Sequence, residues 1–241
     1  MGWPGTRFLL MGLIVVQSCA VACAAQGSFE ILRGQMVEEQ IAGRGIRDPR
    51  ILDALRKVPR HEFVPEHLQQ LAYRDHPLPI GSGQTISQPY IVALMTELAR
   101  VGRDSIVLEI GTGSGYQAAV LSVLAARVYT IEYLEGLGTR ARQRLADLGY
   151  KNVEVKIGDG YQGWPERQPF DAILVTAAAE HVPRPLIDQL KPGGRLVIPV
   201  GRQAEAQSLH VVEKDASGRT KQWEVIPVRF VPLVRPGQTK Q

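Results

Sequence analysis

The sequence predicts a doubly wound, mostly parallel α/β sheet of seven strands that ends in an antiparallel hairpin. Three observations support this fold class. Between residues 105 and 200, short apolar strands alternate with helices, which is the pattern of a parallel sheet with helical crossovers. A strand, a glycine turn and a helix begin this region at residues 105–125. A short turn at 215–218 then joins two further strands, and so short a turn pairs strands antiparallel.

Capping residues locate the helices that precede the sheet. Asp48 and Pro49 are typical of the N-cap and the first position of a helix, and Ser87 and Gln88 stand in capping positions before the next one. Pro and Gly are frequent over 60–83, which predicts loops there. The predicted helices cover residues 29–42, 49–58, 89–100, 116–125, 135–148 and 184–191, and the predicted strands cover 105–110, 127–132, 153–157, 171–176, 195–200, 208–214 and 223–233.

The composition is that of an ordinary globular chain. Its 241 residues are 44% hydrophobic and 22% charged, which suits one large domain. The net charge of +4 is spread without a lysine or arginine block, so a mixed, solvated surface is favoured over a nucleic-acid patch. The histidines lack metal-ligand spacing, and the Gly-x-Ser-x-Gly elbow of serine hydrolases is absent from the sequence.

The first 25 residues differ from the rest. Arg7 precedes a short apolar run at 8–16, and small residues with an Ala-x-Ala-like end follow, which indicates a secretory signal peptide. The run is too short for a comfortable membrane span. Both cysteines, Cys19 and Cys23, lie in this segment, so a cleaved chain would have no disulfide, thiolate ligand or cysteine nucleophile. The alternatives are an acylated Cys23 and an uncleaved extension on a cytoplasmic protein.

The glycine turn carries the prediction of a ligand. A dinucleotide fingerprint requires glycine at position 116, where this chain has Tyr116. The pattern present is Glu-x-Gly-x-Gly-x-Gly, and a carboxylate there repels a pyrophosphate but suits a ligand with an ammonium group. S-adenosylmethionine has that ammonium and no phosphate. The alternative is a turn that serves only strand–helix packing. The predicted cofactor residues of the turn are Glu109, Gly111, Thr112, Gly113 and Gly115.

Acidic residues follow the next two strands, and ligands of such sheets bind beyond the carboxyl ends of strands. Glu132 closes the strand at 127–132, where a carboxylate can take both hydroxyls of a ribose in one bidentate contact. Gly158, Asp159 and Gly160 follow the third strand and could present an acceptor to a planar base. A solvated strand-end glutamate and a simple turn are the respective alternatives.

Taken together, these stretches show that the chain from about Ile31 to Leu233 resembles the protein-L-isoaspartate O-methyltransferase family. The glycine turn resembles motif I of many Rossmann-like S-adenosylmethionine-dependent methyltransferases. Thr-Ile-Ser-Gln-Pro at 85–89 and Val-Pro-Leu at 231–233 are far more specific to this family. Further matching segments are 158–160, 171–173, 177–179 and 186–196.

The resemblance implies methyl transfer from S-adenosylmethionine to the side-chain carboxylate of L-isoaspartyl residues in damaged proteins and peptides. It implies that Ser87 is the catalytic residue, that Thr85 flanks both cofactor and substrate, and that Val231 belongs to the wall that receives the peptide. His181 could contact substrate, although an exposed loop histidine is the commoner outcome. Neither a nucleic acid nor a stable membrane association is expected, and a monomer is implied.

The expected domain covers residues 26–241. Within it, 30–100 form the helical, substrate-side region, 101–201 the cofactor-binding core and 202–241 the C-terminal strands. Family members are usually cytoplasmic, whereas the N-terminal segment predicts a periplasmic or secreted protein that would need S-adenosylmethionine outside the cytoplasm. The rival hypotheses are a methyltransferase with another acceptor, such as RNA or a small molecule, and a module that binds without methyl transfer.

Overall fold

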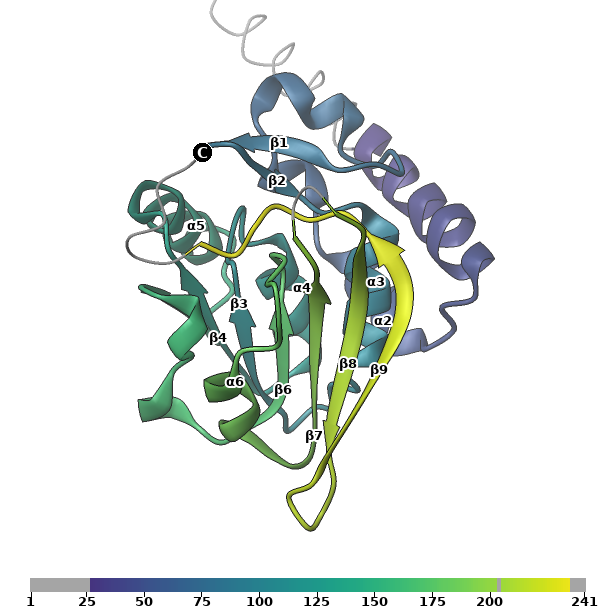
Figure 1. The fold of residues 1–241 in the computed structure, drawn as a ribbon. Coiled ribbons are helices and arrows are strands. Elements are labelled where there is room, and N and C mark those ends of the chain that lie inside the picture. Colours follow the sequence, from purple (N-terminus) through teal and green to yellow (C-terminus); the bar gives the residue numbers. More distant parts are fainter. Residues whose placement is uncertain (1–26, 203–204, 235–241) are drawn as a thin grey trace, which may run out of the picture.

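The computed structural model describes residues 27–202 and 205–234, and its centre is a seven-stranded sheet with the order β5-β4-β3-β6-β7-β8-β9 (Figure 1). The strands from β5 to β7 are parallel, and β8 and β9 are added antiparallel, so the predicted fold class is confirmed. The strands are β3 Ile106–Ile110, β4 Arg127–Glu132, β5 Val153–Ile157, β6 Phe170–Val175, β7 Leu190–Val200, β8 Gln207–Lys214 and β9 Thr220–Val228. The chain order reverses between β3 and β6, and a crevice opens at such a switch point.

Helices cover both faces of this sheet, because its strands carry apolar side chains in both directions. Val107 packs in one hydrophobic cluster with the N-terminal helices and α2, α3 and α4, whereas Leu108 packs in a second cluster with α6. The N-terminal α-helix, predicted over 29–42, covers 27–35 and continues as a π-helix and a 3-10 turn. The helices with printed bounds are η1 Met36–Ile41, η2 Ala42–Arg44, α2 Pro49–Lys57, η3 Arg60–Phe63, η4 Glu66–Leu71, α3 Pro89–Leu98, α4 Tyr116–Leu124, α5 Glu135–Asp147, η5 Gly160–Gln162, η6 Pro165–Arg167 and α6 Arg184–Asp188.

A two-stranded ribbon lies above the carboxyl ends of the sheet (Figure 1). It consists of β1 Leu78–Gly81 and β2 Gln84–Ile86, which pair antiparallel. The prediction of loops over 60–83 was therefore wrong in part, since this stretch also holds η3 and η4. Tertiary packing explains the difference, because Leu78 and Ile86 are buried in the core and hold the ribbon despite its Pro and Gly residues.

The capping predictions had different outcomes. Asp48 is the N-cap of α2, and its Oδ1 accepts a 2.9 Å hydrogen bond from the backbone N–H of Arg50, as predicted. For α3 the predicted position of Gln88 at the N-cap is confirmed, whereas the predicted side-chain cap is not formed. Gln88 occupies the N-cap position, but its side chain makes no capping bond and its amide instead donates to the carbonyl of Asp75 at 3.3 Å.

Two predicted boundaries in the C-terminal half were also wrong. α6 ends at Asp188 and β7 begins at Leu190, because Leu190 already pairs with Phe170 of β6. The last strand ends at Val228 rather than at 233. The side chain of Gln207 satisfies the backbone of Phe230, which would otherwise pair in the sheet. Its amide oxygen accepts from the N–H of Phe230 at 2.6 Å, and its amide nitrogen donates to the carbonyl of Phe230 at 3.2 Å. The chain beyond it therefore leaves the sheet and reaches the end of β6, where Pro232 bridges Ala178.

We expect Asp48→Ala to lower the free energy of unfolding by about 1 kcal/mol, because the first turn of α2 loses its cap. Urea denaturation measures this change. Asp53→Ala is the matched control on the same helix, since it removes only the exposed ion pair with Arg56 and should cost less than about 0.5 kcal/mol. Equal losses in the two variants would contradict the capping role.

Candidate functional site

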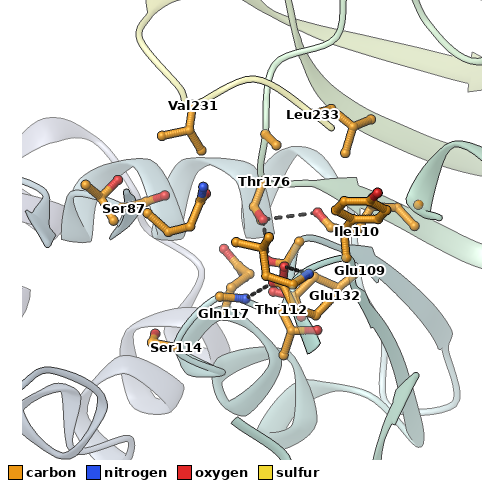
Figure 2. A pocket seen from close by; sticks show the side chains of 18 of the residues that line it. Ser87, Glu109, Ile110, Thr112, Ser114, Gln117, Glu132, Thr176, Val231 and Leu233 are labelled. Atoms are coloured by element: carbon orange, nitrogen blue, oxygen red, sulfur yellow. Dashed lines mark hydrogen bonds between the residues drawn. The ribbon is translucent and has the colours of Figure 1, made fainter. Parts of the chain in front are cut away.

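A pocket opens at the switch point between β3 and β6, below the ribbon formed by β1 and β2 (Figure 2). It holds about 770 Å³ of empty space, including the open solvent at its mouth. Its walls come from β2, the glycine turn, the first turn of α4, the ends of β4 and β6, and residues 231–234. Of the predicted site residues, those that line it are Thr85, Ser87, Glu109, Gly111, Thr112, Gly113, Glu132, Gly160 and Val231.

Glycine is required at the start of the turn because another segment passes very close to it. Gly111 has a φ of +96°, and a Cβ there would lie 2.5 Å from Oγ1 of Thr176. That hydroxyl donates to the carbonyl of Gly111 at 2.6 Å, which ties the turn to the end of β6. Gly113 also has a positive φ, and Ile80 of the ribbon would lie 3.5 Å from a Cβ added to it. The close approach of Thr176 therefore requires glycine at position 111, whereas at position 113 the positive φ is what favours glycine.

Glu132 helps to build the turn as well as lining the pocket. Its Oε2 accepts from the N–H of Gly113 at 2.8 Å, and its Oε1 accepts from the N–H of Leu134 at 3.0 Å. These bonds fix the carboxylate at the pocket wall, and each oxygen retains a further acceptor site. The ribose contact expected of Glu132 is compatible with this orientation and stays a prediction.

Glu109 is fully buried beneath the turn, and burial raises the pKa of its carboxyl group to about 8. Its Oε2 accepts a 2.5 Å hydrogen bond from the hydroxyl of Thr130, which opposes that rise. Since the Thr130 hydroxyl hydrogen is used in this way, the Thr112 hydroxyl, 2.7 Å away, donates to Thr130. Oε1 has no partner among the residues that the structure describes. A buried, unmatched acceptor at a pocket wall suits a cationic donor group.

Four predicted site residues lie outside the pocket lining. Asp159 is the N-cap of η5 and accepts from the N–H of Tyr161 at 2.9 Å. Gly158 donates its N–H to the carbonyl of Glu132 at 2.9 Å, and Gly115 is the left-handed N-cap of α4. His181 is exposed on the loop after β6. The first three thus fix segments next to the pocket, and any ligand contact by these four residues stays a prediction.

Several residues that line the pocket were not predicted as site residues, and the polar ones include Gln84, Ser114, Gln117 and Thr176, of which only Thr176 was expected at the ligand-binding edge of the sheet (Figure 2). Gln117 is in the first turn of α4, and its amide nitrogen donates to the hydroxyl of Thr96 at 2.9 Å. That hydroxyl in turn donates to the carbonyl of Val92, so the orientation of the amide is fixed. The signal for Thr176 was its place at the end of β6, where a predicted strand meets the switch point. Nothing in the residue pattern marked Gln117.

Comparison with known proteins identifies close relatives. The model of the family "Protein-L-isoaspartate(D-aspartate) O-methyltransferase (PCMT)" matches residues 32–238. Protein-L-isoaspartate O-methyltransferase 1 of Nitrosospira multiformis is 56% identical over 224 residues, which are 92% of this chain and 94% of the relative. Protein-L-isoaspartate O-methyltransferase of a Synechococcus species is 59% identical over 216 residues, 87% of this chain and 88% of the relative.

Two solved structures support the same comparison. A protein-L-isoaspartate O-methyltransferase aligns with a TM-score of 0.74 and 30% identity, over 85% of this chain and 65% of the other. A Plasmodium falciparum chain assigned to the same enzymes, in complex with S-adenosyl-L-homocysteine, aligns with a TM-score of 0.72 and 25% identity. This alignment covers 84% of this chain and 98% of the other.

We expect the contribution of Glu109 to the stability of the protein to fall as the pH rises from about 4.5 to about 8, because folded Glu109 keeps its proton over this window and the unfolded chain does not. Glu109→Gln stays neutral at every pH and lacks this loss. Within this window the unfolding free energy of Glu109→Gln should rise relative to that of the wild type by up to about 1.4 kcal/mol per pH unit. Above the window the difference between the two should stay constant. Urea denaturation at several pH values measures the difference.

Glu39→Gln is the matched control, because it removes an exposed carboxylate from the N-terminal region. If the curve of Glu109→Gln stays parallel to that of the wild type between pH 5 and pH 8, the buried proton on Glu109 is refuted.

Proposed function

Given that this chain belongs to the protein-L-isoaspartate(D-aspartate) O-methyltransferase family, we propose that the pocket below the ribbon is its active site. The enzyme transfers a methyl group from S-adenosylmethionine to the side-chain carboxylate of L-isoaspartyl residues in damaged proteins and peptides. The methyl ester closes to a succinimide, whose hydrolysis returns part of the material to normal aspartate. The observation that carries the proposal is that one cavity joins the acidic glycine turn to Ser87.

The residues of the pocket fit the cofactor. Once Glu109 gives up its proton to bind the cofactor, its unmatched Oε1 is an acceptor for an ammonium group, and Glu132 is placed to accept from ribose hydroxyls. Gly111 and Gly113 leave the backbone of the turn without side chains toward the pocket. When bound, the cofactor supplies an electrophilic methyl group on a sulfonium. Asp159, Gly158 and Gly160 lie at the end of β5, and we assign them to the side of the adenine base.

The acceptor needs no general base, because a carboxylate is already ionised at neutral pH. The protein therefore has to bind the acceptor, hold it in line with the methyl group and exclude water, and such positioning can be worth about 7–11 kcal/mol. Methyl transfer to this acceptor therefore does not depend on a paired acid and base. We assign the orientation of the acceptor carboxylate to the Ser87 hydroxyl, with Thr85 and Val231 as further walls. His181 would meet the peptide outside the pocket.

We expect Ser87→Ala to lower kcat by about 10- to 100-fold, while cofactor affinity stays within about twofold, because the hydroxyl acts on the acceptor alone. The assay uses labelled S-adenosylmethionine with two peptides that differ only in isoaspartate versus aspartate. Methanol-releasable label should appear on the isoaspartyl peptide. Glu132→Ala is the complementary variant, and calorimetry should show weaker cofactor binding. Unchanged kinetics in Ser87→Ala, or unchanged affinity in Glu132→Ala, would refute the respective role.

We also propose that the protein is exported and that its active unit is a monomer. Residues 1–25, which carry the signal-peptide pattern, lie outside the described residues. Cleavage after this segment would spare Phe29, which is buried and stacks on the ring of His61 with 4.1 Å between centroids. The monomer is proposed from the resemblance to the family alone. Among the described residues, no helix is long and apolar enough to cross a membrane.

Export predicts that the full chain, expressed in a Gram-negative bacterium, reaches the periplasm with a mass reduced by the first 25 or so residues. Cell fractionation and intact-mass measurement test this. A chain without residues 1–25 is the matched control and should stay in the cytoplasm. Cys23→Ser should leave processing unchanged if the segment is an ordinary signal peptide, and block it if Cys23 is acylated. An intact N-terminus in the cytoplasmic fraction would contradict export.

A further inference from the structure

Arg60 is a fully buried cation directly behind the acceptor side of the pocket. It is the first residue of η3, and none of its side chain is exposed. Its Nη2 donates to the carbonyl of Ser87 at 2.7 Å, and its Nε donates to the carbonyl of Ala72 at 2.7 Å. Its guanidinium carbon lies 4.9 Å from the ring centroid of Tyr116. Ser87 and Tyr116 both line the pocket, so the charge lies behind two adjoining parts of its wall.

The charge of Arg60 is not balanced by an acid. No ion pair joins Arg60 to a carboxylate among the residues that the structure describes, and its Nη1 has no hydrogen-bond partner there. Burial lowers the pKa of Arg60 to about 10, which still leaves the guanidinium charged at neutral pH. A buried charge without a counter-charge is strongly unfavourable. Two backbone carbonyls could be satisfied by a neutral donor, so their hydrogen bonds do not by themselves account for a cation at this position.

We propose that Arg60 is a positioning residue for the acceptor, which fixes the Ser87 backbone and supplies the positive potential that selects an isoaspartyl carboxylate. The proposal rests on the pocket being the active site. In a poorly solvated interior, the attraction between a cation and a carboxylate extends beyond hydrogen-bond distance. No contact between the guanidinium and the acceptor is needed, because Ser87 stands between them and provides the hydroxyl that meets it.

The charge change in the reaction decides which kinetic constant the cation affects most. The acceptor loses its negative charge as the ester forms, so a fixed cation stabilises the bound carboxylate more than the transition state. Removing the charge should therefore raise KM for the isoaspartyl peptide and lower the preference for a charged acceptor, whereas kcat should change less. A purely structural role would lower activity without changing that preference.

The test measures how strongly two peptides inhibit methylation of a labelled isoaspartyl reporter peptide. One inhibitor carries the free isoaspartyl carboxylate, and in the other the same group is a carboxamide. We expect the wild type to prefer the carboxylate by at least about tenfold. Arg60→Gln is neutral but can still donate to the Ser87 carbonyl. In this variant the carboxylate-to-carboxamide preference should fall toward a ratio of one, and KM should rise about tenfold. Arg60→Lys keeps the charge and should keep most of the preference.

Arg33→Met is the matched control, because Arg33 is a second cation whose charge acts on Tyr116 but that makes no ion pair or hydrogen bond with Ser87 among the described residues. Its preference should equal that of the wild type. Folding of each variant is checked by thermal denaturation and by binding of S-adenosylhomocysteine. A folded Arg60→Gln with an unchanged preference, or an Arg60→Lys that loses it, would overturn the proposal alone. A wild type that methylates no isoaspartyl peptide would overturn the proposed function together with it.

Discussion

The passage of Gly111 against Thr176 is the contact on which the pocket depends. The backbone of the glycine turn leaves β3 at the switch point and runs so close to the end of β6 that a Cβ would be 2.5 Å from the threonine hydroxyl. The same hydroxyl donates to the carbonyl of Gly111, and Glu132 holds the N–H of Gly113 from the side of β4. Three neighbouring strand ends are thus joined through one turn. Its shape is fixed by the sheet, which places Glu109 under the pocket.

The other side of the pocket is organised differently. The ribbon of β1 and β2 is short, and its two strands pair with each other rather than with the main sheet. Its end at Ser87 is held instead by the buried side chain of Arg60, which also binds the carbonyl of Ala72. The cofactor side therefore depends on the ladder of the sheet, whereas the acceptor side depends on one cation and the packing around it. A change at Arg60 can alter the acceptor side while the glycine turn keeps its shape.

The residue pattern predicted the sheet well because alternation of apolar strands and helices is a local property. The capping role of Asp48 and the hairpin turn at 215–218 were also local, and both are present. The errors arose where distant segments decide the conformation. Gln207 ends β9 at Val228 by binding the backbone of Phe230, which no local pattern reveals. The pocket residues of the glycine turn were found from a motif, but Gln117 was missed because its orientation is set by Thr96 on another helix. The buried cation at Arg60 was missed for the same reason.

The charges around the pocket match the two reactants of this enzyme. The cofactor is a cation with an ammonium group, and Glu109 and Glu132 lie at the end of the pocket that we assign to it. The acceptor is an anion, and the buried guanidinium of Arg60 lies behind Ser87 at the other end. Because methyl transfer removes the negative charge of the acceptor, the ester is attracted less strongly than the carboxylate by the guanidinium of Arg60. The same charge that attracts the acceptor should therefore help the methyl ester to leave.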